Sequence, residues 1–243
     1  MGRFEAGLVS VSFRELSVVE IIKLAKEAGL SFIEWGSDVH APFSDEKRLS
    51  EIALLSKEWE IGISSYGTYY KIGQNKKEEI IPYIKAAKIL GTDVLRIWCE
   101  KAEDRDELIC ECIMLSKIAE SENVKLCLEC HNGTFTENID DALYLMDKVN
   151  SENFRMYYQP NQFKSEEENL IYAERMAPFT ENIHVFNWMG NEKYPLAEGR
   201  GVWEKYLSFF KGGKLLLEFM PDGKKESLKT EAKSLFDIME ELK

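Results

Sequence analysis

The chain has 243 residues, of which 44% are hydrophobic and 30% are charged, which is the composition of a folded globular protein and excludes a disordered or fibrous one. Acidic residues outnumber basic ones by 43 to 31, and the resulting formal charge of −12 argues against a nucleic acid as partner, because such proteins carry a basic surface. We find no run of about 18 apolar residues and no leader with an apolar core, so we expect no membrane contact and a cytoplasmic location.

Short runs of β-branched and aromatic residues recur along the chain at intervals of 27 to 33 residues. They begin near Phe4, Ser31, Glu60, Thr92, Asn123, Phe154, Glu181 and Lys214. A segment with apolar residues at helical spacing follows each run. These helices are predicted at Ser17–Ala28, Asp45–Glu58, Ile80–Ala87, Leu108–Ala119, Ile139–Met146, Ser165–Met176, after Trp203 and at Leu228–Leu242. Ser17 with Glu20 and Ser165 with Glu168 have the spacing of capping boxes.

Eight strand–helix units of about 30 residues, without an intervening linker, predict an α/β protein with a single (β/α)8 TIM barrel over residues 1–243. A doubly wound open sheet is the alternative, and it normally has a glycine-rich phosphate loop after its first strand. Here the first strand leads into Ser10–Arg14, which contains no glycine. The barrel locates the functional residues, because barrel enzymes carry them at the carboxyl ends of the strands.

Residues with catalytic or ligand-binding chemistry gather at these predicted strand ends. All three histidines, His40, His131 and His184, fall there. Glu129 and Glu218 each follow an apolar run, and a carboxylate at the end of a buried strand needs a partner. The partner is either a lysine or arginine in a structural ion pair, or a metal ion with His184 as a nitrogen ligand. We favour the metal ion.

The same strand ends predict a ligand pocket. Glu129 and His131 are two residues apart and share a strand face, as do Arg96 and Trp98. Aromatic residues also cluster there, namely Trp35, Trp98, Trp188, Tyr66, Tyr69 and Tyr70. Aromatic walls with a few polar groups suit a small polyhydroxylated ligand. We expect the substrate to be bound by His40, Arg96, Trp98, His131 and Asn187.

The five cysteines are predicted to be free thiols, because an odd count without a secretion signal indicates a reducing compartment. Cys127 and Cys130 have the spacing of a redox or zinc motif. They lie in a predicted strand, however, where two small apolar side chains would serve equally well as core filling. We favour core filling.

Four segments resemble the sugar phosphate isomerase/epimerase family, the xylose-isomerase-like TIM barrels. The strongest is Val124–Thr134, in which an apolar strand is followed by Glu-x-His and a Gly/Thr loop. Asn182–Asn187 resembles the strand-seven histidine segment of that family, and Leu215–Glu218 its strand-eight glutamate. Leu30–Trp35 resembles its second strand. The resemblance covers essentially the whole chain, with the four segments in order at barrel spacing.

This resemblance implies a metal-dependent isomerase or epimerase of a sugar or sugar phosphate. Members of the family usually hold one divalent metal ion with Glu, Asp, His and Glu from strands five to eight. Carried over, the ligands are Glu129, Gln159, His184 and Glu218, with Gln159 at the position of the aspartate. An amide oxygen is a suitable ligand for a hard cation, and the donor set suits Mn2+, Mg2+, Co2+ or Zn2+. The family's two glutamates, here Glu129 and Glu218, are the implied acid–base pair that moves a proton through an enediolate.

Three other functions are weighed against this one. A polyol dehydratase of the same fold would use the same metal ion and glutamates to eliminate water. A non-catalytic sugar-binding barrel without metal is suggested by Gln159. An apurinic endonuclease barrel with three zinc ions would need more than three histidines and a basic surface. The expected partner is a small sugar, without nucleic acid or membrane, and homo-oligomerisation stays open.

Overall fold

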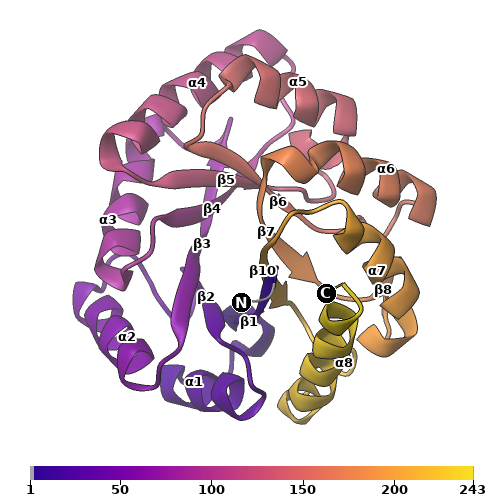
Figure 1. The fold of residues 1–243 in the computed structure, drawn as a ribbon. Coiled ribbons are helices and arrows are strands. Elements are labelled where there is room, and N and C mark those ends of the chain that lie inside the picture. The colour runs from indigo at the N-terminus through magenta and orange to yellow at the C-terminus, as the bar shows by residue number, and fades with distance from the viewer. Residues whose placement is uncertain (1–2, 243) are drawn as a thin grey trace.

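The computed structural model describes residues 3–242, and in it eight parallel strands close into a barrel surrounded by helices (Figure 1). The barrel strands are β1 (Phe4–Val9), β2 (Phe32–Gly36), β3 (Gly62–Ile72), β4 (Val94–Cys99), β5 (Lys125–Glu129), β6 (Phe154–Tyr158), β7 (Thr180–Val185) and β10 (Gly213–Leu217). Each begins within two residues of its predicted start. Strand β1 pairs with both β2 and β10, so the barrel has no open edge. The barrel prediction is confirmed.

The helices lie outside the strands in the predicted order (Figure 1). They are α1 (Val18–Glu27), α2 (Glu46–Glu58), α3 (Ile80–Leu90), α4 (Arg105–Glu122), α5 (Ile139–Val149), α6 (Glu166–Met176), α7 (Arg200–Ser208) and α8 (Leu228–Glu240). Both capping boxes are present, at Ser17 and at Ser165. The loop after β7 contains a small hairpin, β8 (Trp188–Met189) with β9 (Glu192–Lys193), which the sequence did not predict because two-residue strands carry no periodicity.

Side chains of the barrel strands alternate between two apolar cores. One set packs against the helices, and it includes Leu8, Leu95 and Leu128. The other set fills the inside of the barrel and consists mainly of Val9, Val11, Val94, Cys127, Tyr157 and Leu216. This alternation follows from the two-residue period of a strand. Cys127 lies in the inner core and Cys130 in the outer one, both as buried free thiols that fill space.

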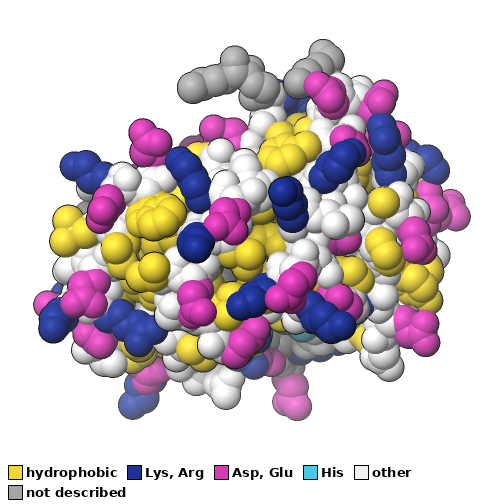
Figure 2. All heavy atoms as spheres, turned by 90° about the horizontal axis from the view of Figure 1, so that it is seen from below, with side chains coloured by type: hydrophobic (Ala, Val, Ile, Leu, Met, Phe, Trp, Pro, Cys, Tyr) yellow, Lys and Arg dark blue, Asp and Glu magenta, His cyan; other side chains and the backbone are white. Residues whose placement is uncertain are grey.

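Figure 2 shows one side of the molecule, on which basic and acidic side chains are interspersed with apolar ones. That face carries no basic stripe of the kind that binds nucleic acid. Among the helices of residues 3–242, none has the length and apolar character needed to cross a membrane.

Tight packing inside the barrel predicts a strong effect of one methyl group at Gly7 in β1. A Cβ atom there would lie 2.7 Å from the carbonyl oxygen of Phe32 and 2.7 Å from Leu216 Cδ2. We expect Gly7→Ala to lower the free energy of unfolding by about 1–3 kcal/mol, the usual cost of overpacking. The control is Gly201→Ala in α7, where a Cβ atom meets nothing within 4 Å. Equal urea midpoints for the two variants would contradict the tight packing at Gly7.

Candidate active site

Charged side chains form a layer directly above the inner apolar core. Arg96 lies two residues beyond Val94 on β4, and Glu129 lies two residues beyond Cys127 on β5, so both point to the inside of the barrel. Glu218 follows Leu216 in the same way at the end of β10. The strand period therefore places these three side chains at the carboxyl end of the barrel, where barrel enzymes have their active sites.

Arg96 is the central cation of this layer and holds two buried carboxylates. Its Nε donates to Glu34 Oε1 on β2 at 2.7 Å, and its Nη1 donates to Glu129 Oε2. The indole Nε1 of Trp98 donates to the same Glu129 oxygen. Arg96 thus fills the role of structural partner to Glu129, in addition to lining the cavity. The sequence predicts that Arg96 contacts substrate oxygens. In the structure, however, two of its three nitrogens already bind protein carboxylates.

Glu34 is the member of the site that the sequence prediction missed. Its carboxylate is fully buried, accepts from Ser65 Oγ at 2.8 Å and lies 3.5 Å from His184 Nε2. Gly67 leaves room for the pair, because a Cβ atom there would lie 2.7 Å from Arg96 Nη2 and 2.8 Å from Glu34 Oε1. The sequence did contain a sign of this pair: Glu34 lies in one apolar strand and Arg96 in another, and a buried charge of either sign needs a partner.

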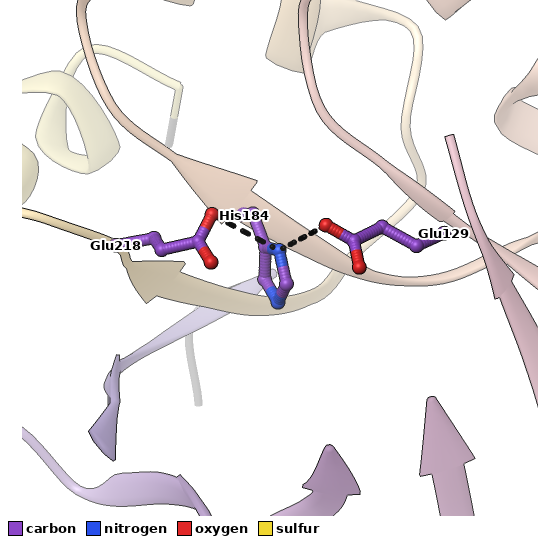
Figure 3. A group of neighbouring side chains, drawn as sticks. All are labelled: Glu129, His184 and Glu218. Atoms are coloured by element: carbon purple, nitrogen blue, oxygen red, sulfur yellow. Dashed lines mark ion pairs between the residues drawn. The ribbon is translucent and has the colours of Figure 1, made fainter. Parts of the chain in front are cut away.

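His184, on β7, lies between the carboxylates of Glu129 and Glu218 (Figure 3). Its Nδ1 is 3.4 Å from Glu218 Oε2, 3.7 Å from Glu129 Oε1 and 3.0 Å from the amide oxygen of Gln159. Three oxygen atoms, one each from Glu129, Gln159 and Glu218 at the ends of different strands, therefore face the same nitrogen atom. The two glutamates approach it from opposite sides, as the dashed lines of Figure 3 show.

The buried charges shift one another's pKa values. Burial favours neutral carboxyl groups, but Arg96 and His184 outweigh it and lower the pKa of Glu34 to about 2. Arg96, followed by His184 and the Trp98 indole, likewise holds the pKa of Glu129 well below its usual range against the effect of burial. Burial raises the pKa of Glu218, with Glu129 adding to it. For His184, burial is outweighed by Glu218, Glu34 and Glu129, which raise its pKa to about 10.

The residues predicted as metal ligands have the donor geometry of a cation site. One ligand atom from each of Glu129, His184 and Glu218 lies within 4.8 Å of the others, and Gln159 Oε1 is adjacent to His184 Nδ1. Three oxygens and one imidazole nitrogen suit a divalent ion. Glu34 is near the other ring nitrogen, as the outer carboxylate of a metal-bound histidine normally is. The donor set therefore fits one divalent metal ion.

A cavity of about 180 Å³ opens above this layer. It is lined by Val11, Arg14, Tyr69, Arg96, Trp98, Glu129, His131, Gln159, Gln162, Phe186, Trp188, Glu218 and Phe219. Trp98 and His131 form one aromatic pair on the lining, with ring centroids 5.4 Å apart. Trp188 and Phe219 form another at 5.5 Å. Of the predicted substrate-binding residues, Arg96, Trp98 and His131 thus reach the cavity.

Two predicted substrate-binding residues lie outside the cavity. His40 is buried with Nδ1 3.2 Å from Ser10 Oγ and Nε2 3.1 Å from the Leu16 carbonyl oxygen, so it ties together the loops after β1 and β2. Asn187 donates to the carbonyl oxygen of Pro195 at 2.9 Å and closes the base of the β8–β9 hairpin. Both follow strand ends in the sequence, but the loop backbone turns their side chains to neighbouring loops.

Three of the aromatic residues predicted at the pocket lie outside the cavity as well. Trp35, Tyr66 and Tyr70 are fully buried in the core between the barrel and the helices. Tyr69, between Tyr66 and Tyr70 in sequence, does line the cavity.

Loss of the central cation is expected to destabilise the protein. In Arg96→Leu the carboxylates of Glu34 and Glu129 would remain buried without their counter-charge, at a cost of about 3–5 kcal/mol in the free energy of unfolding. The matched control is Arg175→Leu, which removes an exposed ion pair with Asp140 and should cost at most about 1 kcal/mol. Chemical denaturation measures both. Native stability in Arg96→Leu would show that the two carboxylates do not depend on Arg96.

Comparisons with known proteins agree with the fold. No curated protein matches the chain. Among solved structures, the probable 3-DHS dehydratase AsbF of Bacillus anthracis, involved in petrobactin synthesis, is 18% identical with a TM-score of 0.77, over 96% of this chain and 98% of that one. The IolI protein with a bound zinc atom is 16% identical with a TM-score of 0.75, over 98% of each chain.

A third similar structure is the D-psicose 3-epimerase of Clostridium cellulolyticum H10, solved with D-tagatose. It is 13% identical with a TM-score of 0.69, over 97% of this chain and 98% of that one. At these identities the likeness concerns the fold. The family model described as xylose isomerase-like TIM barrel matches residues 22–232. With that match over most of its length and a closed barrel of eight parallel strands, the chain belongs to the xylose isomerase-like TIM barrel family.

Proposed function

We propose that the protein is a metal-dependent isomerase or epimerase of a small carbohydrate. The observation that carries the proposal is the convergence of Glu129 and Glu218 from opposite sides on His184 Nδ1, on the floor of a cavity of about 180 Å³. Two carboxylates on opposite sides of a bound sugar are suited to removing a proton from a carbon next to a carbonyl and returning it. The zinc-bound IolI protein and the D-psicose 3-epimerase share this fold.

Glu129, Gln159, His184 and Glu218 would hold the metal ion. When bound, a divalent ion supplies positive charge that stabilises the enediolate formed after proton removal. Within residues 3–242, Glu34 is the carboxylate next to His184 Nε2, at 3.5 Å, so its charge would favour a proton on Nε2 and leave Nδ1 free to bind. Gln159 is neutral, so the two glutamates supply all the negative charge among the four ligands.

The two glutamates are held differently, which suggests different shares of the proton transfer. Glu129 is anchored through one oxygen by Arg96 and Trp98, which keep it ionised and fixed in place. Within residues 3–242, the polar contact of the Glu218 carboxylate is the one that its Oε2 makes with His184, which leaves its other oxygen for the substrate. Burial also makes Glu218 the more basic carboxylate. Glu218 would take or give the proton on one face and Glu129 on the other.

Conversion of each glutamate to glutamine tests this role. We expect Glu129→Gln and Glu218→Gln each to lower kcat by about 10²-fold or more, the scale of general acid–base catalysis, with the fold retained. Glu152→Gln, at a side chain that is 97% exposed, is the control for the same chemical change. The assay incubates free and phosphorylated ketoses with protein and Mn2+ and separates the products by chromatography.

Two results of this assay would contradict the proposal. Near-native turnover in either variant would remove that glutamate from the mechanism. A product lighter than its substrate by one water would identify a dehydratase in place of an isomerase.

The metal ligands are tested by adding a charge at one position. Asp at position 159 would place a third carboxylate beside His184 Nδ1, so we expect Gln159→Asp to bind Mn2+ at least about tenfold more tightly than the native protein. Gln162→Asp is the matched control, because Gln162 lines the same cavity but is not among the four ligands. Calorimetric titration measures both affinities. Absence of Mn2+ binding by the native protein, together with activity that survives a chelator, would rule out the metal-dependent mechanism.

A further inference from the structure

We propose that this site takes an uncharged, unphosphorylated substrate and excludes sugar phosphates. The inference rests on the proposed function in one respect: it takes the cavity above Glu129 and Glu218 as the substrate site. Three independent features carry it: the arginines that line the cavity are already paired, three backbone donors in the loops around its mouth are already used, and the turns after β7 and β10 hold the chain's own carboxylates.

The permanent cations that line the cavity within residues 3–242 are Arg14 and Arg96, and each has a carboxylate partner. Arg96 binds Glu34 and Glu129. Arg14 binds Asp38 Oδ2 through Nε at 2.8 Å and donates to the hydroxyl of Tyr69 at 2.8 Å. With a dication among the ligands, the three buried carboxylates would be balanced by that ion and Arg96. A phosphate would therefore add two negative charges without a spare counter-charge on the lining.

Two lysines near the mouth, Lys71 and Lys193, are not among the residues that line the cavity. Lys71 pairs with Glu100 at 2.7 Å and lies over the Trp98 ring. Lys193 lies over the rings of Trp188 and Phe219, at 4.6 and 5.1 Å from their centroids, and is not part of the cavity lining. It therefore contacts the aromatic wall from outside the cavity.

Three backbone N–H groups in the loops at the carboxyl end of the barrel are also occupied. Phe219, which follows Glu218 directly, has a positive φ of 54° and donates its N–H to Ser12 Oγ at 2.9 Å. Gly190, in the β8–β9 hairpin, donates to the carbonyl oxygen of Gln162 at 2.8 Å. The N–H of Gly133, after β5, is bound by Glu137 Oε2. These N–H groups are therefore not free to cradle a phosphate.

In many TIM barrels the loops after the seventh and eighth strands, with a short helix N-terminus, form a phosphate site, and in this chain each of these two loops holds a carboxylate. After β7, at the turn that opens α7, Glu231 Oε2 accepts from the Leu196 N–H at 2.8 Å. After β10, at the turn that opens α8, Asp222 accepts from the Lys224 N–H at 3.0 Å and from the Ser227 hydroxyl at 2.9 Å. Each carboxylate therefore occupies the N–H or hydroxyl donors of its own turn, so those donors are not free to bind an anionic group.

Binding experiments with inorganic phosphate and with paired sugars test the proposal. Thermal denaturation of the native protein in phosphate, against chloride at equal ionic strength, should show no saturable stabilisation. Tryptophan fluorescence, for which Trp98 and Trp188 on the lining are natural probes, should show at least tenfold weaker binding of fructose 6-phosphate than of fructose, and of inositol 1-phosphate than of inositol. Titrations are run without added metal and at fixed free Mn2+. Saturable phosphate stabilisation, or equal or tighter binding of a phosphorylated sugar, would overturn the proposal.

Two variants that each remove one aspartate test the role of the Asp222 carboxylate at the turn before α8. Asp222→Ala frees the Lys224 N–H and the Ser227 hydroxyl and should gain phosphate-dependent stabilisation. Asp237→Ala removes the same charge from an exposed pair with Lys233 and should not. Equal behaviour of the two variants would overturn the assignment of Asp222 as a phosphate substitute.

Turnover separates this inference from the proposed function. Isomerisation of a sugar phosphate by the native protein would overturn the inference and leave the isomerase assignment standing. If phosphate and sugar phosphates do not bind and no sugar is turned over, the isomerase assignment would be overturned and the exclusion of phosphate would stand.

Discussion

The buried Arg96 side chain is the interaction on which the upper layer of the barrel depends. It joins Glu34 of β2 to Glu129 of β5, so one guanidinium connects strands that are not neighbours in the sheet. Two carboxylates in the interior would otherwise be neutral or would destabilise the fold. Because Arg96 keeps both ionised, Glu129 keeps its charge toward His184, and Glu34 keeps its charge on the other side of the same ring.

This arrangement links stability to function in one set of side chains. A buried ion pair contributes little net stability, and removal of one partner is expensive because the other is left charged and unpaired. Arg96 is therefore better understood as fixing the positions and charges of the glutamates than as strengthening the core. Two aromatic pairs, Trp98 with His131 and Trp188 with Phe219, belong to the cavity lining, and the carboxylates of Glu129 and Glu218 lie on its floor.

The sequence predicted the barrel, and it predicted three residues that the structure brings together, because both patterns are local in the sequence. Apolar runs at intervals near 30 residues identify the strands, and Glu129, His184 and Glu218 stand at or near the ends of three of them. The pairing of Glu34 with Arg96 is not local, since it depends on which side chains face each other across a closed barrel. His40 and Asn187 were misplaced for a related reason: in a loop, backbone turns and not the two-residue period decide where a side chain points.

The closure of β1 onto β10 has a consequence for how the protein matures on the ribosome. Glu34, Arg96 and Glu129 belong to the first half of the chain, whereas His184 and Glu218 belong to the second, and Glu218 follows the last barrel strand. The group of Glu129, His184 and Glu218 therefore cannot be complete before β10 has inserted between β7 and β1. A chain that stalls before its last strand would carry Arg96 with Glu34 and Glu129 but would lack Glu218, and with it one of the two carboxylates that flank His184.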